Sequence, residues 1–364
     1  MSGDRKRHAR ARRWLAILET SRERWGGERR RRHIFRALAE RTGGQIVSGF
    51  TWEAISPSLS PSRLRFPILS DLLPRPRLVS AEMLDPSIVE RLDRYADLVA
   101  VAIYDDPVPH HDAIGLPLAP DHAQTLRAKR EENARAFRWK VMPTLALAEL
   151  AGIPVENVIA GENGTDAERI RPGVWPEDPA IGFISGAAPA RGIETLIETA
   201  RLLHEEVPDL RLLLWLVATG GPSAAYLADL VESVRRERWI EIGAVGRDDL
   251  SHALRQATVM CIPHPAHPYW DATLPVKIFD AFAAGRPLVI TPRTETKRLV
   301  ERHGVGVAAA GDTAEDLAAA IGPLLADETE AKRIGAVARD VAERVYDWPI
   351  VSGRIASAIL EREG

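Results

Sequence analysis

The sequence predicts an α/β protein of two doubly wound domains that face each other across a cleft. Its 364 residues exceed one ordinary domain, which holds about 100 to 200 residues. Short apolar runs alternate with helical patterns in both halves, which favours a parallel sheet covered on both faces in each. Three prolines within residues 170–179 indicate a linker. We therefore expect domains at residues 1–170 and 171–345, and a C-terminal helix at 346–364 that crosses back to the first domain.

The first half contains two segments that we expect to be loops. Residues 56–77 are rich in Pro, Ser and Arg, and residues 107–120 hold four prolines and two adjacent histidines. The expected strands are 14–18, 45–50, 97–103 and 155–160, and the expected helices are 28–41, 87–95 and 124–151, the last broken before Pro143.

The second half is more regular. Ile193, Leu196, Ile197 and Ala200 recur at helical spacing. Asp312 and Glu315 are spaced as an acidic capping box before a further helix. The expected strands are 181–185, 212–217, 239–242, 259–262 and 288–291, and the expected helices are 193–203, 224–236, 248–256 and 275–284, with two more at the end of the chain.

Composition narrows the class of protein. With 45% hydrophobic and 27% charged residues, the chain fits a globular protein with a large core. Its single cysteine, Cys261, lies in an apolar run, which predicts a buried thiol and favours a reducing cytoplasm. No apolar stretch reaches the roughly 20 residues of a membrane span, so we expect a cytoplasmic location.

The charge distribution is uneven although the net charge is only −3. Residues 1–32 hold eleven Arg and one Lys against four acidic residues. This segment is either a solvated tail followed by a charged helix start, or a peripheral contact with anionic lipids at the inner face of a membrane. No aromatic-basic motif accompanies the arginines, so we expect no nucleic-acid partner.

Several loops after predicted strands are candidates for binding an anion. Residues 186–192 run from Gly186 to a helix start and include Arg191, which adds a full charge to the free amides there. The alternative is a connecting loop whose arginine faces water. Gly220, in a paired-glycine turn, and Gly246, after the next strand, allow close approach of a ligand, although a plain turn explains them equally.

A second set of candidates lies on the predicted helix 275–284. Lys277 and Asp280 are three residues apart and share a face. A lysine near a helix N-terminus suits a phosphate, and an aspartate one turn later suits a diol. The alternative is a surface ion pair between the two. Residues 162–166 contain Asn-Gly, a tight-turn signal beside the predicted cleft.

Taken in this order, the motifs resemble the family 4 retaining glycosyltransferases, of the glycosyl transferases group 1. The resemblance rests on residues 162–166, 191–196, 274–289 and 338–348, and more loosely on Gly26 and Gly27. It implies a GT-B fold of two Rossmann-like domains, and a nucleotide-diphosphate sugar as co-substrate rather than a cofactor. It also implies a sugar, polysaccharide or lipid-linked acceptor, retention of anomeric configuration and no metal.

The resemblance also implies roles for individual residues. Arg191 takes the place of the diphosphate-binding lysine, and Asp280 that of the glutamate that binds the ribose hydroxyls. Pro275, Val276 and Lys277 lie where backbone amides would meet the diphosphate. Gly26 and Gly27 would lie in the acceptor-binding loop.

Three positions depart from the family pattern. Ala187 replaces an arginine, Ala272 stands where an acid is common, with Asp271 one place away, and Asp280 is shorter than glutamate. These departures leave two rivals open: a non-catalytic binding or scaffold protein, and a nucleotide-sugar epimerase. In a glycosyltransferase, Lys277, Arg247 or Arg293 would supply the positive charge that is lost with alanine at position 187. His110, His111 and Asp271 are the candidate catalytic residues, although solvated loop histidines remain an alternative.

Overall fold

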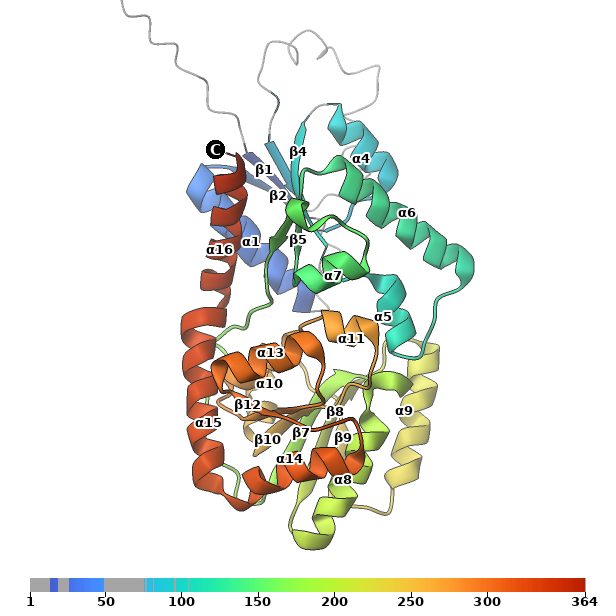
Figure 1. Ribbon diagram of the computed structural model, residues 1–364, viewed down its shortest axis with the longest axis vertical. Coiled ribbons are helices and arrows are strands. Elements are labelled where there is room, and N and C mark those ends of the chain that lie inside the picture. The colour runs from blue at the N-terminus through green and yellow to red at the C-terminus, as the bar shows by residue number, and fades with distance from the viewer. Residues whose placement is uncertain are drawn as a thin grey trace, which may run out of the picture.

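The computed structural model describes residues 14–18, 26–48, 75, 77–80, 82–94, 96–103 and 105–363. Two six-stranded sheets lie one above the other in Figure 1, with helices packed around each. Every strand pair in both sheets is parallel. The prediction of an α/β chain with two parallel sheets is confirmed. Most of the arginine-rich segment 1–32 lies outside the described residues.

The first sheet has the strand order β2-β1-β3-β4-β5-β6. Its strands are β1 (Trp14–Leu18), β2 (Gln45–Ser48), β3 (Arg77–Ser80), β4 (Asp97–Ala102), β5 (Trp139–Met142) and β6 (Val158–Ala160). The helices around it are α1 (Gly26–Thr42), α4 (Pro86–Asp93), α5 (Pro107–Ala113), α6 (Pro120–Ala136), α7 (Leu145–Leu150) and the 3₁₀ turn η1 (Val155–Asn157). The order reverses between β1 and β3, and a ligand crevice is expected beyond such a switch point.

The second sheet has the order β12-β11-β10-β7-β8-β9. Its strands are β7 (Ala180–Gly186), β8 (Arg211–Val217), β9 (Ile240–Gly243), β10 (Val259–Ile262), β11 (Leu288–Ile290) and β12 (Gly306–Ala308). Counted from β7, this is the dinucleotide-binding order, and it reverses between β7 and β10. The loops that follow β7 and β10 therefore flank the expected ligand crevice.

The helices of the second half follow the strand–helix alternation. They are η2 (Pro189–Arg191), α8 (Ile193–Glu206), α9 (Gly221–Val234), α10 (Leu250–Arg255), α11 (Pro268–Ala272), α12 (Val276–Ala283), α13 (Thr294–His303), α14 (Ala314–Ala326), α15 (Glu328–Val341), the π turn η3 (Ala342–Tyr346) and α16 (Trp348–Glu363). None of the helices formed by described residues is long and apolar enough to cross a membrane.

Two expected segments of the first half differ from the structure. Residues 107–120 were predicted as a loop, yet they begin with α5, because the Asp106 carboxylate caps the helix by accepting from the Val108 amide at 3.3 Å and Pro107 suits its first turn. Residues 124–151 were predicted as helix, yet they contain β5, a strand of four residues.

Smaller differences concern short elements. Neither β3, which begins at the last residue of the predicted irregular stretch 56–77, nor β12 was expected. The capping box of α14 lies one residue later than predicted, with Thr313 and Asp316 as its two members. Gly26 and Gly27, expected in a loop, are the first residues of α1.

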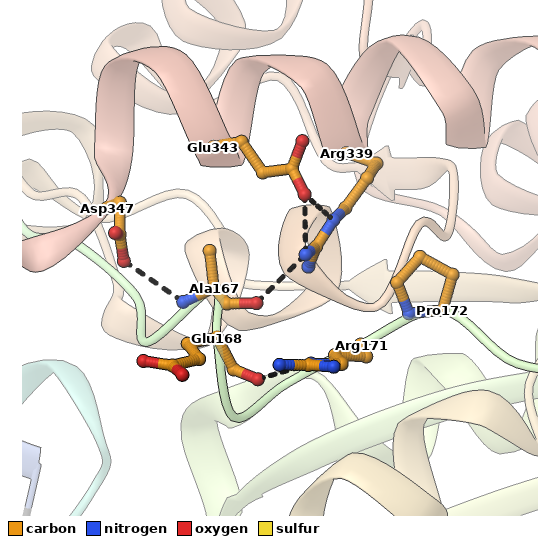
Figure 2. Close-up of a pocket in the computed structure, with 7 residues that line it drawn as sticks. All are labelled: Ala167, Glu168, Arg171, Pro172, Arg339, Glu343 and Asp347. Carbon is orange, nitrogen blue, oxygen red and sulfur yellow. Dashed lines mark hydrogen bonds and ion pairs between the residues drawn. The ribbon is translucent and has the colours of Figure 1, made fainter.

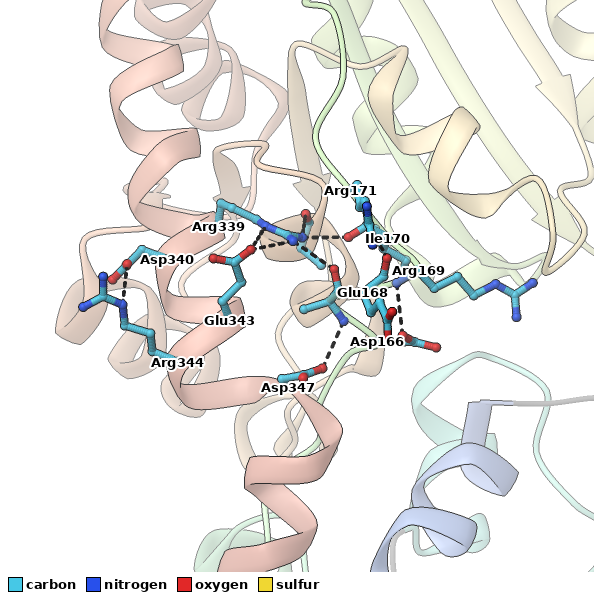
Figure 3. Close-up of polar contacts among 12 residues, drawn as sticks. Asp166, Glu168, Arg169, Ile170, Arg171, Arg339, Asp340, Glu343, Arg344 and Asp347 are labelled. Carbon is cyan, nitrogen blue, oxygen red and sulfur yellow. Dashed lines mark hydrogen bonds and ion pairs between the residues drawn. The ribbon is translucent and has the colours of Figure 1, made fainter.

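The chain crosses between the sheets twice, and the two crossings are joined to each other. The Thr165 amide donates to the Tyr346 carbonyl at 2.8 Å, and the Trp348 amide donates to the Thr165 carbonyl at 2.9 Å. Arg339 of α15 donates to the Ile170 carbonyl at 2.7 Å (Figure 3) and to the Ala167 carbonyl at 2.9 Å. Residues 161–179 form no helix or strand, and the boundary between the two domains remains a prediction.

After the second crossing, α16 returns to the first sheet. It lies alongside α1, as Figure 1 shows on the left. Arg362 donates to the Val158 carbonyl at 2.9 Å, and the Trp139 indole donates to Glu363 at 2.9 Å. The last helix is therefore held by the strands β5 and β6 of the first sheet.

Candidate functional site

Loops at the carboxyl ends of both sheets meet in a contact that we call the interdomain seam. Its first-half side consists of Asp105, after β4, and His110 on α5. Its second-half side consists of Arg191, after β7, with Tyr269 and Trp270 on α11, after β10. Because parallel strands place their carboxyl ends at one edge, each sheet turns its ligand-binding edge toward the other.

The helix α5 is fixed by a buried carboxylate. Asp106 is 2% exposed, caps α5 and forms an ion pair with Arg130 of α6. A charge that is buried in this way needs its partner, since an unpaired one is costly. Asp106 therefore holds the helix that carries His110 and His111.

A glycine positions Arg191 at the other side of the seam. Gly192 has φ of +74°, and a Cβ at this position would lie 1.8 Å from the carbonyl oxygen of Pro263. No other residue fits this turn between η2 and α8. A Cβ on Gly186 would lie 3.9 Å from the Arg191 guanidinium, so this end of β7 lies directly beside that group.

The short helix α11 belongs to the second half in sequence but packs in the first-half core. Tyr269 and Trp270 are 6% and 4% exposed and join the apolar cluster beneath α4 and α7. The Trp270 indole donates to the Ala113 carbonyl of α5 at 3.3 Å. Thr144, just before α7, donates to the carbonyl of Ala272. This helix therefore joins the two sheets directly.

Arg191 points into the seam. Its Nη2 lies 3.1 Å from Nε2 of His110, and its Cζ lies 5.5 Å from the centre of the Trp270 ring. Its Nε is buried without a hydrogen-bond partner, and burial lowers the pKa of the guanidinium from its ordinary value. Among the described residues no carboxylate forms a salt bridge with Arg191.

His110 is the partner of Arg191 across the seam. Burial is the main cause that lowers the pKa of its imidazole, and the Asp105 carboxylate opposes this while Arg191 adds to it. The ring therefore stays neutral near neutral pH. The adjacent His111 is turned elsewhere, with Nδ1 3.1 Å from the Leu116 carbonyl oxygen.

Lys277, in the first turn of α12, is the second cation at this site. Its ammonium donates to the Ser185 hydroxyl at 2.9 Å and lies 4.7 Å from the centre of the Phe183 ring. Parts of the side chain reach the surface, but the ammonium is deep enough that burial, and then Arg191, lower its pKa well below the ordinary value. Within the described part of the chain it meets no carboxylate.

A buried histidine lies behind the two cations. His264, after β10, is 2% exposed and stacks on Trp270 with ring centres 3.9 Å apart. Its Nε2 finds no hydrogen-bond partner in the described part of the chain. Burial, and then the nearby cations, lower its pKa well below the ordinary value. Its place directly after β10, at the switch point of the sheet, is the signal that could have identified it.

Asp280 and Asp271 are bound within the protein. Asp280, the residue predicted to bind ribose, accepts from the Thr165 hydroxyl at 2.8 Å. This hydrogen bond connects it to the first crossing between the sheets. Asp271 accepts from the Thr294 amide at 3.0 Å and lies 3.9 Å from Arg293. Arg293 also pairs with Asp312.

The remaining predicted residues lie at loop and helix starts. Gly220 and Gly246 are exposed, and Gly220 precedes α9. Pro275 is the N-cap of α12, where no side chain caps the free amides that begin at Val276. The acceptor-binding role of Gly26 and Gly27 stays a prediction, as do the roles of all these residues.

A separate cavity of about 600 Å³ lies where the two crossings meet, away from the seam (Figure 2). Its two arginines already have partners, because Arg339 pairs with Glu343 and binds main-chain carbonyls, and Arg171 donates to the Glu168 carbonyl. We therefore place the candidate chemistry in the seam. In the described ranges, no three metal-ligating side chains gather in one place.

The chain is similar to known proteins over both halves. Residues 178–327 match the family model described as Glycosyl transferases group 1. D-inositol 3-phosphate glycosyltransferase 2 of Catenulispora acidiphila is 25% identical over 243 residues, which cover 62% of this chain and 53% of that protein. Phosphatidyl-myo-inositol mannosyltransferase of Mycolicibacterium smegmatis is 28% identical over 169 residues, or 46% and 41% of the two chains.

A solved structure matches nearly the whole chain. Anabaena HepE in complex with UDP superposes with a TM-score of 0.69 at 16% identity, covering 96% of this chain and 100% of that one. The chain therefore has the GT-B fold, as predicted. It spans about half the length of the curated relatives it matches.

Proposed function

We propose that the protein is a glycosyltransferase that moves a sugar from a nucleotide-diphosphate sugar to an acceptor hydroxyl. One observation carries the proposal: Arg191 and Lys277 place two desolvated positive charges in one seam, and neither has a carboxylate partner among the described residues. Buried charges normally require an opposite charge. A diphosphate supplies it.

The backbone adds to this attraction. The first amides of α8 and α12 have no side-chain cap, and both helices begin beside these cations. Free amides and the helix dipole favour an anion at such positions. When the nucleoside diphosphate leaves, negative charge grows on its outer phosphate, and Arg191, Lys277 and these amides would stabilise it.

Among the three cations weighed as substitutes for the one missing at Ala187, Lys277 fits best. Arg293 is already paired with Asp312 and lies near Asp271, and Arg247 is exposed. The matched region 178–327 contains both Arg191 and Lys277. HepE, a structural neighbour, was solved with UDP, which makes UDP the first nucleotide to test.

We further propose that transfer proceeds with retention, without a metal ion, and to a sugar, polysaccharide or lipid-linked acceptor. The acceptor would approach from the first half, past Gly26 and Gly27, toward His110. Asp280 would bind the ribose hydroxyls after exchanging its bond with Thr165. The closed seam would exclude water and so limit hydrolysis of the donor.

Calorimetry with UDP-, GDP- and dTDP-sugars tests the donor site. Loss of a charge-assisted hydrogen bond of about 1.5 to 3 kcal/mol predicts that Arg191→Ala raises the dissociation constant roughly 10- to 150-fold. Arg333→Ala is the matched control, because that arginine pairs with Glu330 on the exposed face of α15. Equal affinities of Arg191→Ala and wild type would refute the diphosphate site.

Product analysis then tests the reaction. With donor and an acceptor mixture we expect a glycoside with the donor's anomeric configuration, formed equally in the presence of a chelator. Conversion of the donor alone would instead identify an epimerase. Donor binding without any product across the acceptor mixture would identify a binding protein.

A further inference from the structure

Asp105 contacts both sides of the interdomain seam, although no sequence motif singled it out. It lies in the short connection between β4 and α5, and its side chain is 47% exposed. One carboxylate oxygen lies 3.4 Å from Nδ1 of His110, and the other accepts the hydroxyl hydrogen of Tyr269 on α11. The carboxylate therefore joins the histidine helix to the opposite half of the protein.

The two ring nitrogens of His110 have different partners. Nε2 lies 3.1 Å from Nη2 of Arg191. A guanidinium group only donates hydrogen bonds, so Nε2 must act as the acceptor. In a neutral imidazole the proton then resides on Nδ1, which is the nitrogen that faces Asp105.

We propose that Asp105 is a positioning residue, which holds His110 as the Nδ1–H tautomer and keeps the Nε2 lone pair turned toward the anion site. The inference extends the proposed function, since Arg191 is the proposed diphosphate ligand. A diphosphate that binds Arg191 replaces His110 as the hydrogen-bond partner of the guanidinium. The Nε2 lone pair is then free to accept a hydrogen bond from a substrate hydroxyl, because the proton stays on Nδ1.

Of the charged and titratable groups near His110, Asp105 is the one that suits this role. Among the described residues, the charged and titratable groups around the ring are Asp105 after β4, His111 on α5, Arg191 on η2, Tyr269 on α11, Lys277 on α12 and His264 after β10. Asp105 is the one carboxylate in this set. The others are cations, imidazoles, or a phenol whose pKa is raised by burial and by Asp105.

Histidine NMR tests the role without any ligand. Ring nitrogen shifts distinguish the two tautomers, and His110→Gln assigns the signal. In the wild type we expect Nδ1–H. In Asp105→Ala we expect a mixture of tautomers and a His110 titration midpoint about one pH unit lower, since a nearby carboxylate raises a histidine pKa by roughly that amount. Asp105→Asn, which keeps an acceptor but no charge, is expected to lower the midpoint while retaining Nδ1–H.

The control is Asp112→Ala. Asp112 lies on the same helix and contacts His267 across the seam at 3.4 Å, but it is 71% exposed and does not contact His110. We expect its His110 signal to match the wild type. Identical tautomer shifts and midpoints in Asp105→Ala and wild type would overturn the inference, as would an equal change in Asp112→Ala.

Adding UDP separates this inference from the proposed function. In the wild type we expect UDP to displace Arg191 and move the His110 Nε2 signal. If UDP does not bind but Asp105→Ala changes the tautomer, the positioning role holds and the proposed donor site fails. If UDP binds while Asp105→Ala leaves the tautomer and midpoint unchanged, the donor site holds and the role of Asp105 is wrong.

Discussion

Replacing Lys277 with methionine is expected to weaken nucleotide binding while leaving the fold intact. Methionine keeps an unbranched apolar stem against Phe183 and removes only the ammonium. In the structure this ammonium has the Ser185 hydroxyl as its hydrogen-bond partner and Arg191 as a neighbouring charge. Its charge is therefore unfavourable until an anion arrives, and binding and stability should respond in different ways.

The magnitudes follow from the contacts. A charge-assisted hydrogen bond to phosphate contributes about 1.5 to 3 kcal/mol, so the dissociation constant for UDP should rise roughly 10- to 150-fold. Leaving Ser185 without its partner costs about 1 kcal/mol. Removing a desolvated charge offsets this, so the free energy of unfolding without ligand should change by less than about 1 kcal/mol.

The dependence of stability on pH gives a second measure of the same charge. Burial, and then Arg191, lower the pKa of Lys277 in the folded protein. Between that lowered value and the ordinary lysine pKa of about 10.4, the unfolded chain binds more protons than the folded one. The free energy of unfolding of the wild type should therefore rise with pH in this window, relative to that of Lys277→Met.

Calorimetry with UDP and urea denaturation at a series of alkaline pH values measure both effects. Lys297→Met is the control, because that lysine is exposed on α13 and pairs with Glu301. If both variants bind UDP as tightly as the wild type, Lys277 does not contact the diphosphate. If the free energies of unfolding of the wild type and Lys277→Met change in parallel with pH, the ammonium of Lys277 is not desolvated.

Two further predictions concern the elements that position the site. Asp106→Ala removes the cap of α5 and leaves Arg130 without its buried partner, so urea denaturation should show a loss of about 2 to 5 kcal/mol; a loss under 1 kcal/mol would contradict the pairing. Gly192→Ala places a Cβ 1.8 Å from the Pro263 carbonyl oxygen at a φ of +74°, and should cost at least about 2 kcal/mol. A variant as stable as the wild type would show that this turn relaxes easily.

The second sheet could be predicted from the sequence because its central strands are buried on both faces. β7, β8, β10 and β11 are nearly continuous apolar runs, and such runs indicate a covered parallel sheet. The first sheet gives weaker signals. β5 has only four residues, and Lys140 lies in the middle of it, so the run resembled the helix before it.

The proline-rich residues 107–120 differ from the prediction because a helix cap decides their structure. Residues 107–120 contain enough proline to suggest a loop, yet Pro107 at a first turn and Asp106 before it form a helix start. The sequence contains the residues of this cap. The sequence does not show that Arg130 pairs with Asp106, because Arg130 lies 24 residues away on another helix.

The candidate site likewise combines residues with local sequence signals and residues whose partners are distant in sequence. Arg191 and Lys277 each follow a local signal, a glycine loop or a helix start, and the structure brings them into one seam. Asp105 and Tyr269 have no such signal, because each acquires its role from the other across 164 residues of sequence. Contacts between domains are set by how two finished sheets pack, and one sequence does not reveal that.

The packing of α11 limits how the two sheets can separate to admit a donor. Tyr269 and Trp270 lie in the first-half core although their helix follows β10. Aromatic side chains bury roughly 150 to 250 Å² each, and at about 25 cal/mol per Å² their exposure would cost several kcal/mol per ring. A rotation that pulls α11 out of that core is therefore unfavourable. A rotation that carries α11 with the first half leaves both rings covered and strains the residues on either side of it.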